Sequence, residues 1–293
     1  MQYVPLQVMS TFSLLQSTST ITELVQTAKQ QGYTDLALTD IDVMYGIVDF
    51  YNACRQADIN PILGITLNLQ GSQLTEQTFS LVVLAKDLAG YQALMRLSTM
   101  KQTAGDDGLV LSAVLPELGH LIVMTPAKDS ELSALLLQNE AERAQAWCQE
   151  LAAKVDPASL YLGVSLDEAP VLRAAVQEFA QRAGLPIVAL DPVDYVQPTD
   201  YFAVSVLRAI DRGQQIEQPE QLQGIAGAHY LRPAETVVAD YQKLDLLPAV
   251  TATTTIAASC HVELVFRQPQ LPLSPIHISE PTRLRRISYA VFC

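Results

Sequence analysis

The sequence predicts an α/β fold in which short buried strands alternate with helices around a barrel of parallel strands. Two observations predict it. Short apolar runs and amphipathic stretches follow one another along most of the 293 residues, an alternation typical of strand–helix–strand units. Aspartates also stand directly after apolar runs, at residues 39–42 and 191–194. Parallel α/β folds place their functional side chains at such strand ends.

Residues 32–66 contain one complete unit. An apolar run at residues 36–38 ends in Thr39 and Asp40, and a second run at residues 62–65 follows a turn at Asn60. Between them an apolar helix face is predicted by residues spaced i, i+3, i+4 and i+7, namely Ile47, Phe50, Tyr51 and Cys54. We expect two parallel strands joined by a helix.

The stretch before this unit predicts a strand and a helix. Residues 3–9 form an apolar run. Thr20 and Glu23 have the spacing of a capping box, in which each side chain bonds the other residue's backbone amide. Gly32 then supplies the stop of the helix that begins here.

The same patterns predict the elements that follow. We expect strands at residues 79–85, 120–125, 160–165 and 186–190, and helices at residues 90–100, 130–154, 169–183, 199–210, 233–246 and 248–260. Polar residues predict loops at 102–108 and 213–227.

The charge balance and the cysteines narrow the class of protein. The net charge is −13, from 18 basic and 31 acidic residues, which argues against a segment that grips DNA phosphates by itself. No apolar run is long enough to cross a membrane, and the start lacks the features of a signal peptide. Four scattered cysteines without metal-site spacing fit buried thiols in a reducing compartment. We therefore expect a cytoplasmic protein with no membrane partner.

Residues 37–66, ALTDIDVMYGIVDFYNACRQADINPILGIT, resemble the PHP (polymerase and histidinol phosphatase) domain. The version they resemble stands at the N-terminus of the alpha subunit of bacterial DNA polymerase III. The resemblance extends loosely over residues 3–272 and implies a PHP-type distorted (β/α)7, TIM-like barrel at residues 1–272. It also implies that this domain is part of a longer chain, a DNA-directed DNA polymerase.

The last residues follow a different pattern. Residues 273–293 contain IHISEPTR and ISYAVFC, which resemble translated sequencing adapters. We expect this tail to be non-native and disordered, and we exclude it from the reasoning on the fold.

The resemblance also identifies the positions of a metal site. An intact PHP domain binds metal ions at its strand ends and hydrolyses phosphate esters, which requires converging imidazoles and carboxylates. The family's ligand positions are occupied here by poor ligands or by lone carboxylates: Gln7, Met9, Asp40, Ile41, Thr66, Ser80, Asp194 and Asp200. Val204 stands at a further histidine position. Amide, thioether and alkyl side chains cannot replace imidazole nitrogens, so no residue is assigned as catalytic, metal-binding or cofactor-binding.

Two interpretations of the aspartates stay open. They could be solvated strand-end and helix-cap carboxylates, or they could converge on a weak Mg²⁺ or Ca²⁺ site; they are Asp40, Asp42, Asp191, Asp194 and Asp200. The histidines outside the excluded tail, His120, His229 and His261, lie at no motif position and are interpreted as ordinary surface or loop residues.

The preferred function is a scaffold. A barrel without its metals can still brace the polymerase core of the same chain, with DNA held by other domains and other replisome subunits as partners. The fragment then needs no cofactor, whereas the parent nucleotidyltransferase, acting in DNA replication, uses Mg²⁺. The alternative is an enzyme, either a metal-dependent PHP phosphoesterase or a proofreading 3'-5' exonuclease. It would need histidines at positions 7, 9, 41, 194 and 204.

Overall fold

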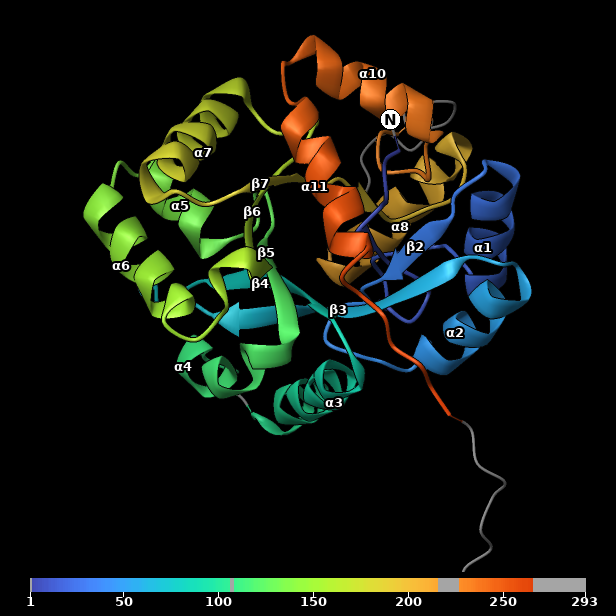
Figure 1. Cartoon of the computed structure of the whole chain (residues 1–293), viewed down its shortest axis with the longest axis horizontal. Coiled ribbons are helices and arrows are strands. Elements are labelled where there is room, and N and C mark those ends of the chain that lie inside the picture. Colours follow the sequence, from blue (N-terminus) through green and yellow to red (C-terminus); the bar gives the residue numbers. More distant parts are fainter. Residues whose placement is uncertain (1, 106–107, 216–226, 266–293) are drawn as a thin grey trace, which may run out of the picture. The chain divides into compact units, whose positions relative to one another are not determined.

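A curled sheet forms most of the wall of a barrel (Figure 1). The structure is a computed structural model that describes residues 2–105, 108–215 and 227–265. Within these ranges the sheet has six strands, in the order β2 (Asp35–Leu38), β3 (Asn60–Gln70), β4 (Thr78–Ala85), β5 (Leu121–Thr125), β6 (Leu160–Val164) and β7 (Ile187–Ala189). The chain divides into two units, Met1–Glu263 and Leu264–Cys293, and the first contains the barrel.

Two further strands close the wall between β7 and β2. β1 (Gln7–Val8) pairs in parallel with β8 (Pro192–Val193), which follows β7 after two residues. On its other side β1 meets β2, because the Thr39 amide donates to the Val8 carbonyl at 2.7 Å. With β7 and β8 as two halves of one strand, the described residues give seven strand positions, which confirms the predicted TIM-like barrel.

One strand runs against the predicted direction. β2 and β3 are parallel, as are β5, β6 and β7, but β4 is antiparallel to both β3 and β5. The prediction of all-parallel strands was therefore wrong at this strand. The cause is the connection, since residues 71–77 are too few for a helical crossover and form a hairpin instead.

Helices surround the strands (Figure 1). The bounds are α1 (Ile21–Gln30), α2 (Ile47–Gln56), α3 (Leu88–Thr103), α4 (Leu111–Val114), α5 (Glu131–Leu137), α6 (Ala141–Ala152), α7 (Pro170–Ala183), α8 (Tyr201–Asp211), α10 (Ala234–Lys243) and α11 (Leu247–Ala257), with 3₁₀ turns η1 (Leu115–His120), η2 (Pro157–Ser159) and η3 (Pro198–Asp200). The capping box of Thr20 and Glu23 is confirmed. The single helix predicted over 130–154 was wrong, because Asn139 takes a left-handed φ of 58° and breaks it.

The barrel interior is apolar at one end and polar at the other. Its core is filled by side chains from every part of the wall, and Ile256, Ala257 and Cys260, at the end of α11 and just beyond, pack against it. The Val4 amide, which precedes β1, donates to Thr253 Oγ1 of α11 at 3.1 Å, so α11 lies at the N-terminal end of the wall. The opposite end, where β1, β2 and β6 finish, is the barrel mouth.

Some predictions lie outside this description. The tail at residues 273–293 and most of the predicted loop at 213–227 fall on residues that the structure does not describe. No helix in the described ranges is both long enough and apolar enough to cross a membrane.

Candidate functional site

A cavity of about 270 Å³ opens at the barrel mouth. Most of the positions that the resemblance singled out line it, namely Gln7, Met9, Ile41, Thr66, Ser80 and Asp194. They come from neighbouring strand ends, and Ile41 and Thr66 form a parallel bridge between the strands. Ser80 also lines the cavity, because β4 runs antiparallel to β3 and the first residues of β4 therefore lie at the mouth.

Asp40 does not line the cavity and has a structural role. Its carboxylate is buried and accepts hydrogen bonds from the Ser10 amide at 2.7 Å, the Ser10 hydroxyl at 2.8 Å and the Ser13 hydroxyl at 2.7 Å. Burial raises the pKa of Asp40, although these hydrogen bonds oppose the rise. Asp40 therefore fixes the loop that follows β1 instead of facing the cavity.

The other aspartates are also directed elsewhere, except Asp194. Asp42 accepts a hydrogen bond from the Asn68 amide at 2.8 Å. Asp191 faces Arg232 at 3.6 Å, and burial raises its pKa. Asp200 accepts from the backbone amide that precedes η3. Of the five aspartates considered from the sequence, Asp194 is the one that lines the cavity.

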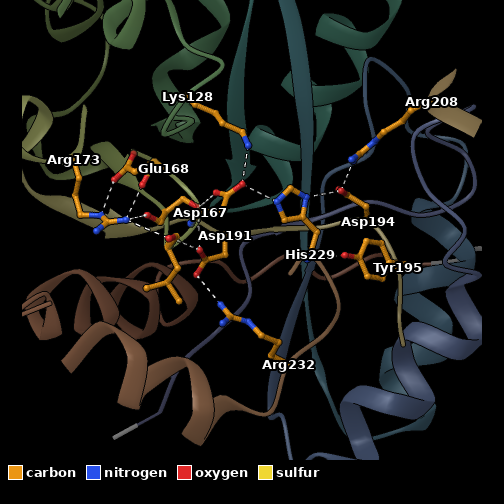
Figure 2. A network of polar contacts seen from close by, with 12 residues as sticks. Lys128, Asp167, Glu168, Arg173, Asp191, Asp194, Tyr195, Arg208, His229 and Arg232 are labelled. Atoms are coloured by element: carbon orange, nitrogen blue, oxygen red, sulfur yellow. Dashed lines mark hydrogen bonds and ion pairs between the residues drawn. The ribbon is translucent and has the colours of Figure 1, made fainter. Parts of the chain in front are cut away.

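The centre of the mouth is a histidine between two carboxylates (Figure 2). His229 Nδ1 lies 2.9 Å from Asp194 Oδ2, and His229 Nε2 lies 2.8 Å from Asp167 Oδ2. An ionised carboxylate only accepts hydrogen bonds, so each ring nitrogen donates and the ring is an imidazolium. One cation of the chain therefore joins two loops of the mouth.

Two more cations complete the network. Lys128, on the loop after β5, lies 2.7 Å from Asp167 Oδ2. Arg208, on α8, pairs with Asp194 Oδ2. Lys128, Asp167, Asp194, Arg208 and His229 all line the cavity. Figure 2 shows them in one row across the mouth.

The pKa values follow these contacts. Burial alone would lower the pKa of His229, but the hydrogen bonds to Asp167 and Asp194 outweigh it and raise the pKa to about 9. The hydrogen bond from His229 holds the pKa of Asp167 well below its usual range, against the effect of burial. Burial raises the pKa of neighbouring Glu168 to about 7, although Arg173 opposes it.

Backbone contacts hold His229 in place. The amide of Asp194 donates to the His229 carbonyl at 2.9 Å, and the His229 amide donates to the Tyr195 hydroxyl at 3.0 Å. Leu231 donates to the Tyr195 carbonyl at 3.2 Å. The interpretation of His229 as an ordinary loop residue was therefore wrong. No local motif marks it, and the available signal was its rarity, as one of only four histidines.

The residues present do not fit the family's metal cluster. Among the residues that the structure describes, no group of three or more His, Cys, Asp or Glu side chains is placed to hold a metal ion. The side chains at the ligand positions given by the resemblance offer mainly amide, thioether and hydroxyl groups, and Asp167 and Asp194 already face cations of the chain. Among the described side chains that line the cavity, Asp194 Oδ1 is a buried atom without a hydrogen-bond partner.

The chain is similar to known proteins over nearly all of its length. A family model described as "PHP domain" matches residues 5–165. The DNA polymerase III subunit alpha of Bacillus subtilis (strain 168) is 31% identical over 278 residues, which cover 94% of this chain and 24% of the relative. The same subunit of Halalkalibacterium halodurans is 28% identical, covering 93% and 24%. The error-prone DNA polymerase of Symbiobacterium thermophilum is 28% identical, covering 89% and 25%. The chain thus spans about a quarter of the length of these curated relatives.

Proposed function

The chain belongs to the PHP domain family, and we propose that it is the PHP domain of a DNA polymerase III alpha subunit, where its barrel supports the polymerase part. The observation that carries the proposal is the chemistry of the mouth. The positions where a hydrolytic PHP domain needs metal ligands hold Gln7, Met9, Ile41 and Thr66, and the nearby Asp167 and Asp194 are paired with the chain's own cations. A barrel so arranged contributes through its packing and rigidity.

In this proposal, the polymerase activity lies in parts of the longer subunit outside this domain. The polymerase part would join nucleotides with Mg²⁺ during DNA replication in the cytoplasm. The chain's net charge of −13 supports a division in which other domains hold the DNA. Its partners would be the polymerase core and other replisome subunits.

The alternative is a metal-dependent phosphoesterase or a 3'-5' exonuclease. Either would require a metal-bound water as nucleophile and ligands to hold the metal ions. Met9 and Ile41 cannot supply these ligands, and Val204 is buried on α8. This enzyme remains the second candidate function, because intact PHP domains hydrolyse phosphate esters.

The scaffold proposal predicts that loosening the barrel weakens the polymerase. In Gly163→Ala a new Cβ would lie 2.4 Å from the Thr125 carbonyl oxygen of the next strand, and such overpacking costs about 1–3 kcal/mol. In the full-length subunit that carries this domain, we expect polymerase inactivation at a temperature lower by about 2–8 °C, with unchanged turnover at low temperature.

The matched control is Gly119→Ala, whose Cβ would meet no atom within 4 Å. It should leave both turnover and the inactivation temperature unchanged. If Gly163→Ala destabilises the barrel but the polymerase inactivates at the original temperature, the two parts are independent and the proposal fails.

A further inference from the structure

A groove of about 870 Å³ lies between α7 and α11. It is separate from the cavity at the mouth, since the described residues that line the two do not overlap. We propose that this groove is the docking site of an apolar segment of the polymerase part of the longer subunit. The inference rests on the proposed function, which places the barrel beside a polymerase part, and it adds the face through which the two make contact.

The groove is apolar at its centre and polar at its rim. Among its lining residues Tyr161 and Leu246 are buried, whereas Gln181 and Thr255 are exposed. Interfaces between proteins have this arrangement. A small-molecule site instead needs several convergent polar groups to orient its ligand, and Asp245, which is exposed, is the one charged side chain among the described lining residues. The groove therefore suits an apolar protein surface.

α11, which forms one side of the groove, has the composition of a covered helix. Residues 246–260 contain no charged side chain, although charged residues make up 17% of the whole chain. Of the described helices with eight or more residues, α11 is the one without a charge. Thr251 and Thr255 of α11 are nevertheless exposed and line the groove. A surface helix normally carries charges on its outer face, so this face fits one that is covered in a longer protein.

The position of α11 connects the groove to the rest of the subunit. α11 is the last helix of the described residues. Beyond it Cys260 packs in the same core cluster as Tyr161 of the groove, and the His261 amide donates to the Lys86 carbonyl at 2.8 Å. In the proposed subunit the chain continues from this point, close to the groove. Because this chain spans about a quarter of the length of its curated relatives, the rest of such a subunit is large enough to cover the face.

The test measures how fast a thiol on this face reacts with a maleimide, in this chain and in the full-length subunit that carries it. Thr255→Cys places the thiol at an exposed position of the groove. Gln145→Cys is the matched control, because Gln145 is exposed on α6, a helix that carries charged side chains. Mass spectrometry of the labelled peptide separates each new thiol from the cysteines already present.

We expect the thiol of Thr255→Cys to react about 10-fold or more slowly in the full-length subunit than in this chain, because the interface must first open. The thiol of Gln145→Cys should react at the same rate in both. Equal rates for Thr255→Cys would overturn the inference, since the groove would then be open in the subunit. A slow reaction in this chain that speeds up on dilution would also overturn it, because the occupant would be a second copy.

Hydrogen exchange of the unsubstituted proteins gives a second measurement that does not depend on how the variants fold. The amides of residues 244–247, which lead into α11, should exchange about 10-fold more slowly in the full-length subunit than in this chain. Equal exchange in the two proteins would contradict the docking site.

The docking site and the proposed function fail separately. If Thr255→Cys is not protected but Gly163→Ala lowers the temperature of polymerase inactivation, the barrel supports the polymerase through another face. Protection of Thr255→Cys together with no effect of Gly163→Ala would keep the docking site and defeat the supporting role.

Discussion

At the scale of single residues, His229 links the stability of the fold to pH. Its pKa rises from 6.5 to about 9 on folding, so the folded chain binds this proton more tightly than the unfolded chain. The stabilisation is complete below about pH 6.5 and is lost as the pH rises through about 9. Each unit of pKa shift corresponds to about 1.4 kcal/mol.

We therefore expect the advantage of wild type over His229→Gln in free energy of unfolding to shrink by about 3 kcal/mol between about pH 6 and about pH 10. Urea unfolding of both proteins across this range measures it. An advantage that stays constant with pH would mean that His229 does not change its protonation on unfolding in this range.

Asp40 offers a second prediction at this scale, because the resemblance assigns it to a metal position and the structure gives it hydrogen bonds to the loop after β1. Asp40→Ala leaves the Ser10 amide and the Ser10 and Ser13 hydroxyls without their acceptor, so we expect a loss of about 2–4 kcal/mol. Asp40→Asn should cost less, because its amide oxygen can still accept two of the three hydrogen bonds. Chemical denaturation measures both.

Asp200→Ala is the matched control, since Asp200 accepts one backbone hydrogen bond at the start of η3. It should cost about 0.5–1 kcal/mol. Equal losses at Asp40 and Asp200 would contradict the structural role assigned to Asp40.

The residue scale also marks the limit of sequence reasoning about the site. The resemblance identified Gln7, Met9, Ile41 and Thr66 because each lies in or directly after a strand within a recognisable motif, and all four line the cavity. It did not identify Asp167 or the cations. These side chains reach the mouth from separate loops and from α8. They come together only when the barrel closes, so no short sequence motif indicates that they form one site.

At the scale of elements, a buried carboxylate organises the hairpin between β3 and β4. Glu131, at the start of α5, is 3% exposed and accepts hydrogen bonds from the amides of Ser72, Gln73 and Leu74 at 3.0, 2.5 and 2.8 Å. The connection that makes β4 antiparallel is thus tied to the neighbouring helix.

We expect Glu131→Ala to release this connection locally. Amide hydrogen exchange at residues 72–74 should accelerate about 10- to 100-fold, because each lost hydrogen bond of a buried group is worth about 1–3 kcal/mol. Exchange in β6 should stay slow. The exposed Glu142, in the first turn of α6, provides the control, and Glu142→Ala should leave residues 72–74 protected. Unchanged exchange in Glu131→Ala would show that the structure of the hairpin does not depend on its hydrogen bonds to Glu131.

Elements were predictable where their signals are local. The capping box of α1 and the glycine after α7 fix helix ends through neighbouring residues. The direction of β4 was missed because the expected strand at 62–65 stopped too early. β3 continues to Gln70 through alternating buried and partly exposed residues. Only residues 71–77 then remain before β4, and they are enough for a hairpin but not for a helical crossover.

At the scale of the whole molecule, the chain has the barrel of its family with a network of paired charges at the mouth. α11 packs against the core at one end, and a row of paired charges spans the other. Both ends are held by groups of the chain itself. If the barrel is a supporting domain, as proposed, we expect its stability not to depend on added metal.

The most direct test is the metal content and hydrolytic activity of the full chain, purified without chelators. Metal content would be measured by mass spectrometry. Activity would be assayed on a phosphate monoester and on single-stranded DNA, with Mn²⁺ and Zn²⁺ added. A folded chain with far less than one metal ion per molecule and no metal-dependent hydrolysis is the predicted result. One or more bound metal ions together with metal-dependent turnover would contradict the account, because the mouth would then be an active centre.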